Sequence, residues 1–307
     1  MNAPPPPPLP PDRSRVPTEA SHAASRGLHA LPIAACVDLL VSDQLVAVRA
    51  VRAAAPALTG FIQAVADRFE PGGRLIYLGA GTSGRLGVLD ASELMPTFQL
   101  PEGRVVGLIA GGDASLRRSS EHREDDPGGC VPDLQSLRIG RNDAVLGISA
   151  GGTTPYVLGA LRHANALGPD APLTGLLACA PMDPPPFVDH LMLLDTGPEV
   201  LTGSTRLKAG TATKIALNVI STSLMVRTGR VFDNLMVDLR ATNDKLRDRA
   251  ARIIARLCGI DRPAAFELLD RAGGAVKTAV VMHHRGAGRP EAEALLAAQR
   301  GRLDQIL

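Results

Sequence analysis

Five short apolar runs punctuate the chain, and longer segments with helical periodicity separate them. The runs are Arg74–Leu78, Arg104–Ala110, Ala144–Ser149, Leu173–Cys179 and His190–Leu194. Continuous apolar runs of this length are typical of strands buried on both faces of a parallel sheet. Because helices alternate with these runs, the pattern predicts an α/β fold, with a parallel five-stranded sheet between two helical layers.

Helical patterns also fill both ends of the chain. Before the first strand we predict helices at 31–41 and 43–55, and a third after Pro56 with one apolar face made of Leu58, Phe61, Ile62, Val65 and Phe69. After the last strand we predict a long helix over Ser204–Arg227, and then helices at 246–257, 262–271, 274–284 and 290–306. The sheet is therefore expected to have a helical N-terminal segment before it and a small helical subdomain after it.

These patterns divide the chain into three parts. Residues 1–16 are rich in proline and expected to be disordered, 17–246 hold the sheet with its N-terminal helices, and 247–307 form the helical subdomain. The first residues lack the basic flank and apolar core of a signal peptide, and no apolar run reaches the length of a membrane span. We therefore expect a cytoplasmic protein without membrane association.

A glycine-rich turn follows the first strand, within the stretch LIYLGAGTSGRLGVLDASELMPT (75–97). Gly81, Thr82, Ser83 and Gly84 open a helix that carries Glu93, and Pro96 is expected to end it. A helix N-terminus presents unpaired backbone N–H groups and the positive end of the helix dipole. The turn therefore predicts an anion-binding site.

The same turn also fits the dinucleotide fingerprint G-x-G-x-x-G. The acidic residue that would hold a ribose is not clearly placed, since Asp113 follows the second strand only after a Gly-Gly pair. The hydroxyls of Thr82 and Ser83 suit a terminal phosphate equally well. The local pattern leaves both ligands open.

A second turn of this kind follows the third strand and consists of Gly151, Gly152, Thr153 and Thr154. The carboxyl ends of parallel strands share one edge of the sheet, which is where ligands bind. Two hydroxyl-bearing turns on that edge can hold one small phosphorylated ligand from both sides, whereas a dinucleotide needs one such turn. The pair of turns favours a small phosphorylated ligand. The alternative that the second turn only starts a helix and binds no ligand stays open.

Charge and spacing narrow the function classes. The net charge of +2, without a basic patch interleaved with aromatic residues, indicates no nucleic-acid partner. Cys36, Cys130, Cys179 and Cys258 lack C-x-x-C spacing, and the seven histidines lack metal-binding spacing. We therefore expect buried thiols in a reducing compartment and no metal site. Glu121, Glu124 and Asp125 are predicted to share one face of a helix with nearby arginines. Taken singly, these carboxylates and Glu93 are best interpreted as solvated helix residues.

Six blocks of the chain resemble one known family. The similarity runs in uninterrupted order from about Pro17 to the C-terminus. The six blocks are LIYLGAGTSGRLGVLDASE with PTF (75–98), VVGLIAGGD (105–113), Glu-x-x-Glu-Asp (121–125), GISAGGTTPYV (147–157), GPEVLTGSTRLKAGTATK (197–214) and NLMVDLRATNDKL (234–246). The chain is similar to the N-acetylmuramic acid 6-phosphate etherases, bacterial enzymes of the sugar-isomerase (SIS) fold. The 197–214 block is shared with the related glucokinase regulatory protein. The resemblance implies a three-layer αβα SIS domain.

The resemblance also implies a reaction and a site. D-lactate is cleaved from the 3-O-ether of N-acetylmuramate 6-phosphate by elimination and then hydration, giving N-acetylglucosamine 6-phosphate, with neither metal nor organic cofactor. Carried over by position, Glu93 and Glu124 are the two catalytic carboxylates. The phosphosugar is expected to contact both glycine turns, together with Ser204 and Lys208 of the 197–214 block.

The chemistry of this reaction demands two proton-transfer groups. Opening the sugar exposes an aldehyde, which acidifies the C2 proton; a base removes that proton, and an acid protonates the departing lactate oxygen. Each group contributes about 10²–10⁴-fold, and two glutamates can divide the roles when their environments differ. We assign Glu93 as the acid and Glu124 as the base.

Helix geometry adds an expectation about assembly. Glu93 follows Ser83 by ten residues, which is roughly 15 Å along a helix at 1.5 Å per residue. This exceeds the reach from a sugar phosphate to C3. We therefore predict a homodimer in which Glu93 acts on the sugar held by the partner's turns, with Glu124 supplied by that same partner.

Some positions depart from the family pattern. Gly151–Pro155 stands where the family usually has Ser-Gly-Arg-Thr-Pro, so one hydroxyl and one cation are missing. Both glutamates are retained. Three alternatives stay open: a non-catalytic sugar-phosphate-sensing regulator, an SIS sugar-phosphate isomerase that would release no lactate, and a nicotinamide-dependent enzyme.

Overall fold

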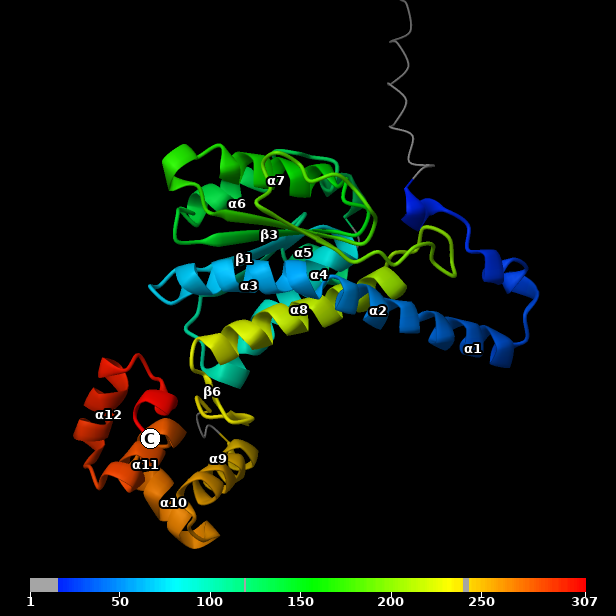
Figure 1. Cartoon of the computed structure of the whole chain (residues 1–307). Helices are drawn as coiled ribbons and strands as arrows, with labels where there is room; N and C mark the ends of the chain where they lie inside the picture. Colours follow the sequence, from blue (N-terminus) through cyan, green and yellow to red (C-terminus); the bar gives the residue numbers. More distant parts are fainter. Residues whose placement is uncertain (1–15, 119, 240–242) are drawn as a thin grey trace, which may run out of the picture.

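The computed structural model describes residues 16–118, 120–239 and 243–307 (Figure 1). Nearly all of the tail predicted at 1–16 thus lies outside the described residues. The described chain begins with three single turns of 3-10 helix at Pro17–Glu19, Ala23–Ser25 and Leu28–Ala30.

All five predicted strands are present in one sheet. They are β1 (Leu75–Gly79), β2 (Val105–Ile109), β3 (Ala144–Ser149), β4 (Leu173–Ala178) and β5 (His190–Leu193). Their order is β2-β1-β3-β4-β5, and every neighbouring pair is parallel. The predicted α/β fold with a parallel five-stranded sheet is confirmed.

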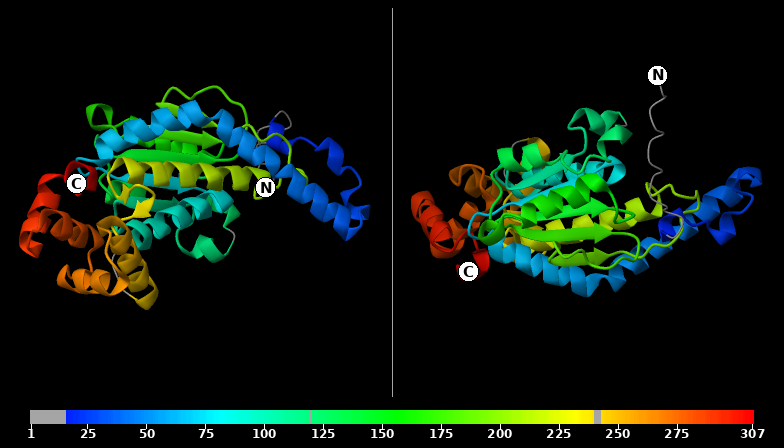
Figure 2. Two further views of the ribbon diagram at one scale, coloured as in Figure 1. Left: turned by 60° about the horizontal axis from the view of Figure 1, so that its bottom comes forward. Right: turned by 90° about the horizontal axis from the view of Figure 1, so that it is seen from above.

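Helices cover both faces of this sheet (Figure 2). α3 (Ala55–Phe69), α4 (Gly81–Phe98) and α8 (Lys208–Arg227) cover one face, and α6 (Val131–Ser136) and α7 (Pro155–Asn165) cover the other. Successive side chains of a strand point to opposite faces, so Leu75 and Tyr77 of β1 join the first core, whereas Ile76 and Leu78 join the second. Each helical layer therefore has its own apolar core on one shared sheet.

Two further helices extend the first layer into an arm. α2 (Leu45–Ala53) packs against α8, and α1 (Ile33–Asp43) continues beyond the sheet (Figure 1). Residues three and four apart share one face of a helix. At this spacing the arm exposes more than half of each of five apolar residues, which we call the arm stripe: Ile33, Val37, Val41, Leu45 and Val48.

The C-terminal helices have a core of their own. α9 (Asp244–Cys258), α10 (Arg262–Arg271), α11 (Val276–Arg285) and α12 (Arg289–Ala298) pack together, and Val237 and Leu239 join their core. A small hairpin of β6 (Val231–Phe232) and β7 (Leu235–Met236), which the sequence patterns did not predict, leads into this unit. The division into 17–246 and 247–307 remains a prediction.

The helix predicted through Glu121, Glu124 and Asp125 is wrong. The structure has α5 (Ala114–Arg117) and then a separate 3-10 turn at Glu121–Arg123, so Glu121, Glu124 and Asp125 do not belong to one helix. Serine hydroxyls compete with helical bonding here: Ser120 Oγ hydrogen-bonds Ser115 Oγ and donates to the Ala110 carbonyl. Glu124 therefore lies in an irregular segment.

Three predicted helix ends also differ. α4 continues through Pro96 to Phe98, although a proline inside a helix lacks an N–H and crowds the carbonyl four residues before it. α8 begins at Lys208 and not at Ser204. The Glu199 carboxylate accepts hydrogen bonds from the first backbone N–H groups of the helix, those of Lys208 and Ala209. α12 ends at Ala298, because Arg300 and Gly301 take positive φ angles of 51° and 74°.

Candidate active site

The sheet topology brings the two glycine turns together. β1 and β3 are neighbours, with Gly79 paired to Ile148, so the turns that follow them lie side by side at the carboxyl edge. From β1 the chain passes through α4 on one face to β2, and from β3 it passes through α7 on the other face to β4. A sheet of order 2-1-3-4-5 has its ligand crevice at this β1/β3 switch point.

The first turn owes its glycines to close packing. A Cβ on Gly84 would lie 2.6 Å from the Gly79 carbonyl oxygen, and one on Gly79 would lie 2.7 Å from Gly84 N. Gly81 takes a φ of 51°, which favours glycine. The helix cap at Ala80 makes no side-chain hydrogen bond, so the first N–H groups of α4 remain for a ligand. The glycine pattern therefore follows from strand–helix contact and does not by itself identify a dinucleotide.

The second turn uses part of its own hydroxyl content. Ser149 Oγ and Thr154 Oγ1 are 2.8 Å apart, so the predicted ligand hydroxyl of Thr154 is engaged within the turn. Gly152 has a φ of 73° beneath Met182, and Thr153 is exposed. Thr153 is thus the hydroxyl of this turn that faces outward.

Two other segments reach the same edge. A Cβ on Gly210, near the start of α8, would lie 3.5 Å from Thr82 Cγ2. The Pro17–Glu19 turn lies between the second glycine turn and the loop before α8. Thr18 Oγ1 is 4.0 Å from the position of a Cβ on Gly151, and Glu19 Oε2 is 3.0 Å from that of a Cβ on Gly203. The Thr18 hydroxyl is buried and has no hydrogen-bond partner among the described residues. No local pattern marked this N-terminal segment, because only the tertiary fold brings it to the turns.

The structure directs Lys208 away from solvent. Its ammonium lies 2.9 Å from Asp43 Oδ1 of α1 and donates to the Pro198 carbonyl at 2.8 Å. Ser204 is half-buried in the loop before α8. Lys208 therefore joins the arm to α8, and its predicted contact with a phosphosugar remains a prediction.

Glu124 lies beside the second turn. Its backbone carbonyl accepts from Tyr156 N at 3.0 Å, and Tyr156 follows Thr154 by two residues. The segment also presses on α7 at Gly159, where a Cβ would lie 1.9 Å from the Pro127 carbonyl oxygen. The fold thus brings the predicted base and the second turn together within one chain.

Glu93 lies far along α4 from the first turn. α4 is one continuous helix from Gly81 to Phe98, so Ser83 and Glu93 are separated by roughly 15 Å along its axis. The Glu93 side chain is 62% exposed, with Oε2 3.7 Å from Lys214 Nζ of α8. The structure does not bring Glu93 to the first glycine turn of its own chain.

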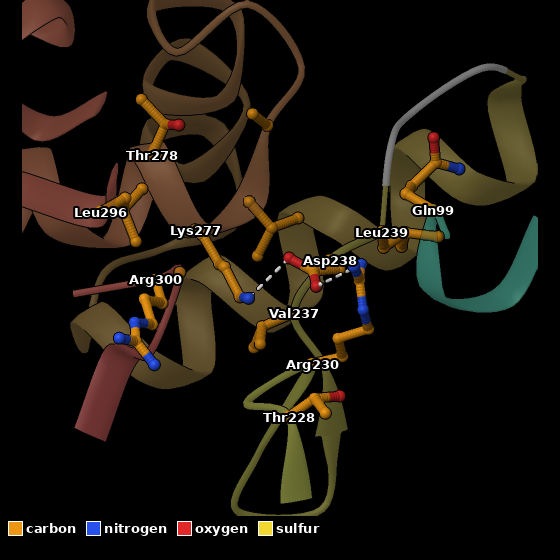
Figure 3. A pocket seen from close by; sticks show the side chains of 13 residues that line it. Gln99, Thr228, Arg230, Val237, Asp238, Leu239, Lys277, Thr278, Leu296 and Arg300 are labelled. Atoms are coloured by element: carbon orange, nitrogen blue, oxygen red, sulfur yellow. Dashed lines mark hydrogen bonds and ion pairs between the residues drawn. The ribbon is translucent and has the colours of Figure 1, made fainter. Parts of the chain in front are cut away.

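A cavity of about 490 Å³ lies elsewhere, where the C-terminal helices meet the sheet domain (Figure 3). Lys277 and Arg230 both point at Asp238, at 2.6 and 3.1 Å. Lys277 also donates to the Gly229 carbonyl after α8, and Arg230 donates to the Phe98 carbonyl at the end of α4. These cations bind helix C-termini and one carboxylate, so they tie the C-terminal helices to α4 and α8.

The part of the chain that the structure describes contains no group of three or more His, Cys, Asp or Glu able to hold a metal ion. Within the same residues, no helix combines the length and apolar character needed to span a membrane.

Comparisons with known proteins agree with this architecture. A family model for the glucokinase regulatory protein N-terminal SIS domain matches residues 57–165. An N-acetylmuramic acid 6-phosphate etherase from Deinococcus radiodurans is 51% identical over 299 residues, covering 94% of both chains. One from Parasynechococcus marenigrum is 48% identical, covering 96% of this chain and 92% of the relative.

Proposed function

The chain belongs to the family of N-acetylmuramic acid 6-phosphate etherases, and we propose that it cleaves the D-lactyl ether of N-acetylmuramate 6-phosphate as a carbon–oxygen lyase. The products are N-acetylglucosamine 6-phosphate and D-lactate. The observation that supports this most directly is the adjacency of two helix-starting turns at the β1/β3 switch point, with Glu124 beside one of them.

The phosphate binds at the two turns. Backbone N–H groups at the start of α4, the hydroxyls of Thr82 and Ser83, and the outward Thr153 provide the contacts. The second turn lacks a cation, so helix dipoles and N–H groups hold the charge there. All four cysteines are free, which fits a cytoplasmic enzyme, but only Cys130 and Cys179 are buried as predicted, whereas Cys36 and Cys258 are partly exposed.

The reaction proceeds by elimination and hydration. Glu124 removes the C2 proton of the open-chain sugar, Glu93 protonates the ether oxygen, and lactate leaves with the C3–O bond electrons. Water then adds at C3 of the resulting double bond, and C2 regains a proton. The acid and the base each supply about 10²–10⁴-fold.

The active site is shared between two subunits. The continuous α4 keeps Glu93 roughly 15 Å from its own phosphate turns, so it acts on the sugar held by a second copy. The arm stripe supports such a dimer, because isolated soluble chains rarely leave a contiguous apolar helix face in water.

The activity is tested by incubation with N-acetylmuramate 6-phosphate in ¹⁸O-labelled water. We expect D-lactate in solution and the label on C3 of the sugar product. Aldose–ketose interconversion without lactate would indicate an isomerase instead, and binding without turnover would indicate a sensor.

Sharing of the site is tested by mixing Glu93→Ala and Glu124→Ala subunits. Random exchange places both intact glutamates in one site of each mixed dimer, so activity should recover to about a quarter of the original in a two-fold symmetric pair. No recovery after demonstrated subunit exchange would contradict the shared site.

A further inference from the structure

Lys214 of α8 lies beside Glu93 and forms an ion pair with the buried carboxylate of Asp90. Its Nζ is 3.3 Å from Asp90 Oδ1 and 3.7 Å from Glu93 Oε2. The Asp90 side chain is only 4% exposed, whereas that of Lys214 is 26% exposed. The ammonium therefore has a buried anchor on one side and an opening to solvent on the other.

The anchor is itself held by two buried donors. Tyr77 Oη lies 3.1 Å from Asp90 Oδ2, and Ser221 Oγ lies 3.4 Å from Asp90 Oδ1. Burial and the adjacent carboxylate raise the pKa of Tyr77, so its hydroxyl stays protonated and donates. These donors share the charge of Asp90, and an ammonium has three N–H groups, so Lys214 keeps donors for a ligand.

The substrate has a second anion in addition to its phosphate. The lactyl carboxylate is attached to the carbon that carries the ether oxygen. A cation that binds this carboxylate must therefore lie close to the acid that protonates that oxygen. Lys214 meets this condition through its contact with Glu93.

We propose, on the basis of the proposed function, that Lys214 binds the lactyl carboxylate and selects substrates that carry it. Glu93 must be protonated to act as an acid, and in that form it no longer competes for the ammonium. The carboxylate of the substrate then takes the place of Glu93 on Lys214, and the Glu93 proton is free for the ether oxygen. Asp90 acts as a positioning residue that holds Lys214 at this point.

The test compares N-acetylmuramate 6-phosphate with its lactyl carboxamide, which has the same shape without the charge. The unsubstituted enzyme should prefer the carboxylate by about 10- to 100-fold in kcat/KM, as expected for a charged hydrogen bond. Lys214→Met should lower kcat/KM for the natural substrate by a similar factor and for the carboxamide by less than about threefold. Lys214→Arg should retain part of the preference.

Both substrates are measured on one preparation, so their ratio does not depend on the folded fraction. Lys245→Met, at an exposed position on α9, is the matched control and should leave the ratio unchanged. An equal loss on both substrates in Lys214→Met would overturn the inference. Failure of the unsubstituted enzyme to release lactate would instead count against the proposed function.

Discussion

The two proposed catalytic glutamates stand on supports that are built in different ways. Glu93 belongs to α4, an 18-residue helix whose inner face is tied through Asp90 to β1 and α8. Glu124 follows a single 3-10 turn, and its segment packs on α7: the Glu124 carbonyl accepts from Tyr156 N, and Pro127 lies against Gly159. One support is a long helix, and the other is an irregular segment packed against α7.

The difference fits the tasks that we propose for the two residues. A group that acts across a subunit interface needs a support that keeps its position without help from the nearby turn, and a helix provides this through its own hydrogen bonds. A group beside the phosphate turn gains its position from that neighbour, so a short anchored loop suffices.

Replacing the carboxylates should give the largest effects and should separate the two roles. Glu93→Gln and Glu124→Gln should each lower lactate release by about 10²–10⁴-fold. In heavy water, Glu93→Gln should still exchange the C2 proton, because the base is intact, whereas Glu124→Gln should not. Proton NMR of the sugar measures both; the opposite pattern of exchange would reverse the assignment.

Displacing the Glu124 segment should cost activity more than an equivalent change in α4. In Gly159→Ala the new Cβ would lie 1.9 Å from the Pro127 backbone oxygen, so the segment must move, and kcat should fall about 10- to 100-fold. In Gly87→Ala the new Cβ would lie 3.0 Å from Tyr77 Cβ and 3.3 Å from Ile148 Cδ1, a much milder overlap that a shift of a few tenths of an ångström relieves. That control should lose at most about 1–3 kcal/mol of stability, with little change in kcat. Similar kcat values for the two variants would show that the segment tolerates displacement.

Weakening the support beneath Glu93 should reduce stability. Tyr77→Phe removes a buried donor to Asp90 and should lower the free energy of unfolding by about 1–3 kcal/mol. Urea titration measures the loss. Ser221→Ala, which removes the longer 3.4 Å contact, should have a smaller effect. An unchanged urea midpoint for Tyr77→Phe would show that Asp90 does not depend on this bond.

The smallest expected effect is a difference in thiol labelling, which reports how often each of the two regions opens. Burial raises the pKa of Cys130, beside the Glu124 segment, and of Cys179, beneath α8, to about 12 in each case. The reactive thiolate is lost below the pKa, so at pH 8 only about one thiol in ten thousand is ionised in the closed state. Opening restores an ordinary thiol, so iodoacetamide should label Cys130 faster than Cys179, as measured by mass spectrometry. Equal rates would mean that the two regions open together.

Local chemistry made much of the fold predictable. The five strands are mostly apolar, and Pro155 at the start of α7 marks its helix without reference to the rest of the chain. The wrong helix predictions involve local contacts that the pattern of apolar and polar residues does not show. The Ser120 hydroxyl bonds to other groups in place of helical hydrogen bonding, and α4 continues two residues past Pro96.

The candidate site divides in the same way. Both turns and both glutamates are visible in the sequence, because glycine, hydroxyl and carboxylate residues stand at marked positions after strands or in blocks that resemble a known family. The contacts of Lys214 with Asp90, and of Thr18 with the second turn, join residues more than a hundred positions apart. No local pattern encodes such pairs.

The sequence by itself determined which segments become strands, where anion-binding turns begin, and which carboxylates match the etherase family. Only the tertiary structure decided that β1 and β3 are neighbours, that Lys208 turns inward to the arm, and that Glu93 stands beside Lys214 far from its own turns. The physical reason is that propensity and capping act over a few residues, whereas packing order, burial and ion pairing depend on which distant segments meet.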